Sequence, residues 1–104
     1  MKTYFFSIIC RSNRYVALAE LERCIAAYGF VTDFKFFSDL SASLQIELQQ
    51  KNLEPLKTSI AAIAHVESDE LHMGKPEVEC TLFCNITFAQ GTGELTIDVP
   101  AVPG

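Results

Sequence analysis

Residues 42–49 read Ala-Ser-Leu-Gln-Ile-Glu-Leu-Gln, with apolar and polar side chains in strict alternation. This period of two is typical of a β-strand that buries one face and exposes the other. Over residues 30–38 a period of two places Phe30, Thr32, Phe34 and Phe36 on one face and Val31, Asp33, Lys35 and Phe37 on the other, as in a half-buried strand. Asp-Leu-Ser at 39–41 has the composition of a turn. The sequence therefore predicts a β-hairpin over residues 30–49.

One helix is expected on each side of this hairpin. Before it, apolar residues recur at three- and four-residue spacing, which predicts a helix over residues 13–28. Gly29 is expected to end that helix in the left-handed conformation that glycine adopts at little steric cost. After the hairpin, Asn52 is expected to cap a second helix that ends near Ala64.

Further strands are expected at both ends of the chain. Residues 3–10 are β-branched and aromatic with almost no polar break, which predicts a central strand covered on both faces. Residues 66–73 suit a short edge strand, and residues 78–89 suit a long one that places Cys80 and Cys84 on one side. Residues 95–99 predict a last short strand.

In chain order, these elements predict an α+β fold, a ferredoxin-like βαββαβ two-layer sandwich over residues 1–74. Both helices are expected on one face of its antiparallel sheet. Residues 78–99 are expected to add a C-terminal β-hairpin, and residues 100–104 a loose tail. At 104 residues the chain has room for one hydrophobic core, so we expect a single domain over 1–104.

The face of the sheet away from the helices is expected to be apolar. The side chains predicted to point there are Phe5, Ile9, Val31 and Phe37. Water does not normally cover a contiguous apolar patch of this kind, so something should shield it. We expect either the C-terminal strands or a second copy of the chain to do so, and self-association as a homodimer is the favoured prediction.

Composition excludes several functions. Thirteen acidic against eight basic residues give a formal net charge of −5, and the basic residues are not clustered, which disfavours nucleic acid as a partner. The apolar runs are much shorter than the roughly 20 residues of a membrane-spanning helix. Four cysteines in a chain without the short, cysteine-dense loops of secreted scaffolds predict reduced thiols and a cytoplasmic location.

The cysteines and histidines do not predict a metal or cofactor site. Cys80 and Cys84 lie two strand repeats apart, roughly 13 Å, which is too far for one metal ion or a disulfide. We therefore interpret them as buried hydrophobes. His72 with nearby carboxylates could form a weak divalent-ion site, but a solvated acidic loop is the favoured interpretation, and His65 suits the end of a helix.

The polar turn Arg11-Ser12-Asn13-Arg14 is the most suggestive feature for function. It precedes the start of the first predicted helix, where backbone N–H groups and two arginines could hold a carboxylate or phosphate of a small ligand. The structural alternative is helix capping with solvated charges. No paired carboxylates, catalytic triad or phosphate-binding loop occurs in the sequence, so no catalytic residue is predicted.

Residues 3–73 resemble an ACT-like regulatory domain. The resemblance rests on Ile9-Cys10-Arg11 ending the first strand, Leu18 and Leu21 in the first helix, the hairpin, and residues 53–66 from Leu-Glu-Pro-Leu to Ala-His-Val. Such domains generally bind amino acids or other small effectors near the loop between the first strand and helix, usually as dimers. The resemblance thus implies a ligand or partner site around residues 12–14.

These observations favour a non-enzymatic regulatory or small-ligand-binding module that acts as a homodimer. Two alternatives remain open. The acidic surface and strand edges could dock onto a larger protein, as in an inhibitor or interaction protein. A small dimeric ferredoxin-like enzyme would instead use a cavity between sheet and helices.

Overall fold

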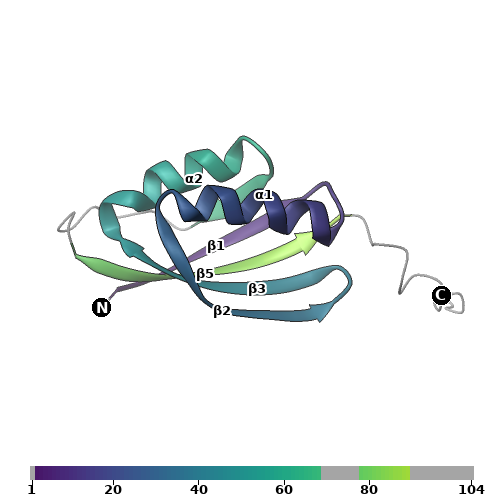
Figure 1. The fold of residues 1–104 in the computed structure, drawn as a ribbon, viewed down its shortest axis with the longest axis horizontal. Helices are drawn as coiled ribbons and strands as arrows, with labels where there is room; N and C mark the ends of the chain where they lie inside the picture. The colour runs from purple at the N-terminus through teal and green to yellow at the C-terminus, as the bar shows by residue number, and fades with distance from the viewer. Residues whose placement is uncertain (1, 69–77, 90–104) are drawn as a thin grey trace, which may run out of the picture.

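The computed structural model describes residues 2–68 and 78–89. Two helices pack on one face of a single β-sheet, so these residues form a two-layer α+β structure (Figure 1). The elements in chain order are β1 (Lys2–Cys10), α1 (Arg14–Ala26), β2 (Gly29–Ser38), β3 (Ser41–Gln49), the 3-10 turn η1 (Gln50–Asn52), α2 (Leu53–Ala61), β4 (His65–Ser68) and β5 (Glu79–Phe88).

The sheet has five strands in the order β2-β3-β5-β1-β4. β5 runs parallel to β1 and antiparallel to β3, and Cys84 of β5 lies opposite Phe6 on one side and Leu44 on the other. This corrects the expected sheet order, because a ferredoxin-like βαββαβ unit would place β1 directly beside β3. The sheet is therefore mixed, not antiparallel throughout. The strand predicted over 95–99 and the tail at 100–104 lie outside the described residues.

The core fills the space between the sheet and the two helices. The strict alternation of residues 42–49 is confirmed, since Ala42, Leu44, Ile46 and Leu48 are buried and their neighbours are not. The other buried apolar side chains are Tyr4, Phe6, Ile8, Cys10, Ala17, Leu21, Ile25, Leu53, Leu56, Ile60, Cys80, Leu82, Cys84, Ile86 and Phe88. Burying a side chain of leucine or isoleucine size contributes about 2 kcal/mol, so this cluster is the main source of stability.

A shift in the pairing of β2 with β3 changes which side chains of β2 face the helices. Val31 lies opposite Ile46, but after the shift at Thr32 it is Phe34 that lies opposite the next buried residue, Leu44. One extra residue in a strand reverses its alternation from that point onward. Val31 and Phe34 therefore share the helix side, and the prediction that Val31 faces the open side is wrong.

The open face of the sheet is more polar than expected. Phe5 and Ile9 are exposed there as predicted, and the ring of Phe5 stacks on that of Phe83 with 5.6 Å between centroids. On β3, however, the side chains between the buried ones are Ser41, Ser43, Gln45, Glu47 and Gln49. Apolar surface on this face thus comes from β1 and β5 and, beyond the polar residues of β3, from Phe30 of β2.

The Asn13 side chain caps its helix, whereas the Asn52 side chain, expected to cap the second helix, does not. The Asn13 side chain caps α1, accepting hydrogen bonds from the backbone N–H groups of Tyr15 and Val16 at 3.0 and 3.2 Å. Asn52 makes no such bond to α2; its side chain instead donates to the carbonyl of Tyr28 at 2.9 Å. Asn52 therefore ties the residues after α1 to the start of α2.

Gly29 opens β2 and does not end α1 in a left-handed conformation. What requires glycine there is the close approach of β3. A β-carbon at this position would lie 2.6 Å from the carbonyl oxygen of Glu47 and 2.7 Å from the β-carbon of Leu48. Neither atom belongs to a flexible side-chain end, so the two strands would have to separate.

We predict that Gly29→Ala lowers the free energy of unfolding by about 1–3 kcal/mol, the range for an added methyl group in a closely packed site. Urea denaturation monitored by circular dichroism measures this. Ser43→Ala on β3 is the control, since it adds no atoms, and it should change stability much less. A Gly29→Ala variant as stable as the native chain would show that β2 and β3 can move apart at no cost.

Candidate functional site

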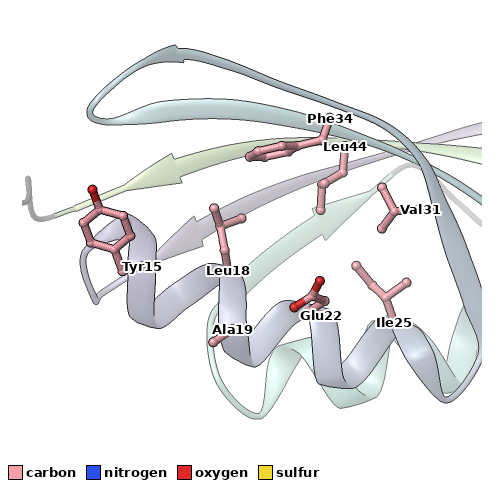
Figure 2. Close-up of a pocket in the computed structure, with 8 residues that line it drawn as sticks. All are labelled: Tyr15, Leu18, Ala19, Glu22, Ile25, Val31, Phe34 and Leu44. Atoms are coloured by element: carbon pink, nitrogen blue, oxygen red, sulfur yellow. The ribbon is translucent and has the colours of Figure 1, made fainter.

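A groove of about 390 Å³ runs between α1 and the hairpin of β2 and β3 (Figure 2). The residues that line it are Tyr15, Leu18, Ala19, Glu22, Ile25, Val31, Phe34 and Leu44. Figure 2 shows Leu18 and Ile25 of α1 pointing toward Phe34, Leu44 and Val31 of the sheet. The groove thus lies on the helix side of the sheet, beside the buried core.

Incomplete coverage of β2 by α1 produces this groove. Leu44 on β3 lies under the helix and is only 6% exposed, whereas Val31 and Phe34 on β2 are each 39% exposed. The register shift in β2 is what turns both of these apolar side chains toward the helix side. The groove therefore depends on local geometry that the alternation of the sequence does not display.

The walls of the groove are apolar, and its polar groups are few. Leu18, Ile25 and Phe34 offer aliphatic and aromatic surface, while the Glu22 carboxylate and the Tyr15 hydroxyl supply the charged and hydrogen-bonding groups. Both Glu22 and Tyr15 are exposed residues of α1. Such a surface fits a ligand with an apolar body and a cationic or hydrogen-bond-donating group.

Arg14 is engaged by its neighbours at the Tyr15 end of α1. Its guanidinium lies 5.1 Å from the ring centroid of Tyr15 and 4.7 Å from that of Phe36, and Nη2 donates to the Tyr15 hydroxyl at 3.2 Å. Its Nε lies 3.6 Å from Oδ1 of Asp39. The side chains of Arg14 and Asp39 are 17% and 5% exposed, so this is a largely buried ion pair.

The four residues of the predicted anion site therefore have different surroundings. Arg11 is exposed and Ser12 is half-buried. The Asn13 side chain caps α1, and Arg14 stacks on two rings beside Asp39. The geometry gives Asn13 and Arg14 structural roles, and a ligand role for the turn stays a prediction. The sequence analysis missed the role of Asp39 because it assigned residues 39–41 only to a turn.

The thiols of the core are not reactive groups. All four cysteines are unpaired, and Cys10, Cys80 and Cys84 are buried. Burial raises the pKa of Cys84 to about 12 and that of Cys10 to about 11, with the Glu20 carboxylate adding to the latter. Burial also raises the pKa of Cys80. The interpretation of Cys80 and Cys84 as small buried hydrophobes is confirmed by their burial.

Of the two histidines, His65 alone lies among the described residues. His65 Nε2 lies 3.0 Å from Oε2 of Glu67, in an exposed pair on β4. His72, Asp69 and Glu70 of the alternative divalent-ion site lie outside the described residues. Across residues 2–68 and 78–89, no group of three or more His, Cys, Asp or Glu side chains is arranged to hold a metal ion.

Comparison of the chain with protein-family models, curated proteins and solved structures found no match. Among the described residues, no helix combines the length and apolar character needed to cross a membrane.

We predict that Arg14 and Asp39 stabilise the fold as a coupled pair. Asp39→Asn alone should lower the free energy of unfolding by about 1–3 kcal/mol, because it leaves a largely buried guanidinium beside a neutral group. Arg14→Met retains an apolar stem over Phe36, so the double variant should lose less than the two single losses added together. Strict additivity in urea denaturation would contradict the pairing.

We also predict selective thiol labelling in the native protein. At pH 8, Cys24 should react with iodoacetamide well before the others, because it is half-buried whereas the remaining three are buried. The raised pKa of Cys10 and Cys84 keeps these thiols protonated at that pH. Mass spectrometry of labelled peptides should find all four modified in denaturant, and equal rates in the native state would contradict the buried core.

Proposed function

We propose that this protein is a non-enzymatic module that binds a small molecule in the groove between α1 and β2. The observation that carries the proposal is an apolar wall left half-exposed beside an otherwise complete core, with Val31 and Phe34 each 39% exposed. A volume of about 390 Å³ lies within the range of small-molecule sites, at its lower end. It suits a ligand of one or two rings or a short branched chain.

The ligand class follows from the charged group of the groove. Glu22 favours a positively charged or hydrogen-bond-donating group, whereas the Tyr15 hydroxyl already accepts a hydrogen bond from Arg14. An aromatic or aliphatic amine meets the requirement set by Glu22. A ligand with a lone carboxylate would place its charge beside Glu22, and repulsion would disfavour it.

Several features support a binding role over a catalytic one. The groove is lined mainly by apolar side chains, whereas the enzyme alternative needs several polar groups that converge in a pocket. The resemblance to ACT-like domains also supports a binding role, since their effectors usually bind near the first loop and helix, and Tyr15 of the groove follows that loop.

We further propose that the fold is a ferredoxin-like βαββαβ unit with β5 inserted between β1 and β3.

The free state of all four thiols supports a cytoplasmic location as part of this proposal. A reducing compartment keeps such thiols unpaired. The acidic sequence pI of about 4.9 is compatible with solubility at neutral pH.

A matched pair of probes tests the proposal. In NMR titrations, we expect 1-naphthylmethylamine to shift the amide signals of α1 and β2. It should bind about two- to fivefold more tightly than 1-naphthaleneacetate, because an ion pair with the exposed Glu22 carboxylate contributes little more than that. Glu22→Gln should remove this preference while leaving apolar binding.

A second pair of variants serves as the steric control. Ala19→Phe places a ring into the groove and should abolish binding of both probes. Ala26→Phe adds the same ring at another exposed alanine of α1 that does not line the groove, and it should bind like the native chain. Shifts absent from α1 and β2, or equal binding to both Phe variants, would contradict the proposal.

A further inference from the structure

β2 is an edge strand with an unusually apolar surface. Among the described residues it lies at one end of the sheet and pairs only with β3, and the described part of β4 at the other end has four residues (Figure 1). All ten residues of β2 except the first are exposed. Its exposed large hydrophobic residues are Phe30, Val31, Phe34, Phe36 and Phe37. A long apolar edge of this kind is a surface on which another strand pairs.

The charges of β2 indicate which strand that is. Asp33 and Lys35 are its only charged residues, and both face the open side of the sheet, opposite Gln45 and Ser43 of β3. If β2 pairs antiparallel with β2 of a second copy about Phe34, Asp33 of each copy lies opposite Lys35 of the other. Two favourable cross-strand charge pairs then form at once.

The adjacent registers lack this complementarity. Pairing centred on Asp33 sets two aspartates opposite each other, and pairing centred on Lys35 sets two lysines opposite each other, which is destabilising in both cases. In the register centred on Phe34, the two Phe34 side chains meet on the helix side, and aromatic cross-strand pairs are stabilising. Charge and packing therefore favour the same alignment.

The irregularities of β2 confine this pairing to a short stretch. The register against β3 shifts between Val31 and Asp33 and again between Phe36 and Ser38, so Asp33–Phe36 is the regular part of the edge. Such shifts twist an edge strand and restrict where it can pair. The stretch that stays regular is the one that carries both charges and Phe34.

We propose that the protein forms a two-fold symmetric homodimer through antiparallel pairing of β2 with β2 of a second copy, with Asp33 opposite Lys35. The two sheets then form one continuous sheet with all helices on the same side, and the grooves of the two copies lie on either side of the axis. This proposal goes beyond ligand binding and does not depend on it.

Charge reversal tests the register by sedimentation equilibrium. The native chain should be dimeric at about 100 µM, and Asp33→Lys or Lys35→Asp should each raise the dissociation constant about tenfold or more, because each creates two like-charge pairs. The double variant with both reversals should regain native affinity. An equimolar mixture of the two single variants should form the heterodimer in preference to either homodimer, which native mass spectrometry detects.

Glu79→Lys is the matched control. It makes the same charge change as Asp33→Lys at an exposed position on β5, away from β2, and it should leave the dissociation constant unchanged. Dimers weakened by Glu79→Lys and not by Asp33→Lys would place the interface on the open sheet face and overturn the proposal. A native chain that stays monomeric at this concentration would also overturn it.

Discussion

The pairing of β5 between β1 and β3 is the interaction on which the rest of the structure depends. Without it, β1 would pair only with the short β4, and β3 only with β2. β5 matches both neighbours along its length, and its helix-facing side chains, from Cys80 to Phe88, are all buried. Two of these are cysteines whose raised pKa keeps them neutral, so they pack as small apolar groups.

The position of β5 also accounts for the groove and for the exposed edge. Strands lie about 4.8 Å apart, so a fifth strand widens the sheet by about that distance while the two helices cover the same width as before. A fifth strand in the middle moves β2 outward by one strand, beyond the cover that α1 provides. The half-exposed side chains of Val31 and Phe34 are the result. The central position of β5 thus accounts for both proposed binding surfaces, the groove beside α1 and the exposed edge of β2.

Local features of the fold were predictable from the sequence, and non-local ones were not. The alternation of residues 42–49 and the helical spacing before the hairpin report the environment of each segment, and the structure has both elements. Alternation cannot tell a central strand from an edge strand, so the place of β5 was missed. The shift at Thr32 leaves no mark in the residue pattern. The ion pair of Asp39 was missed because its partner, Arg14, is distant in sequence. The only sequence signal for it was a carboxylate beside the apolar Leu40 in a turn.

The place of β5 in the sheet has a consequence for how the chain folds. β1 is the first and β5 the last of the described strands along the chain, yet they lie side by side, with Phe6 opposite Cys84. Closing so long a loop is entropically costly, and proteins whose contacts are far apart in sequence fold slowly. The β2–β3 pair and the β1–β4 pair therefore stay separate until β5 pairs between them. During that interval the edges of β1 and β3 are open to a chaperone or to a neighbouring chain.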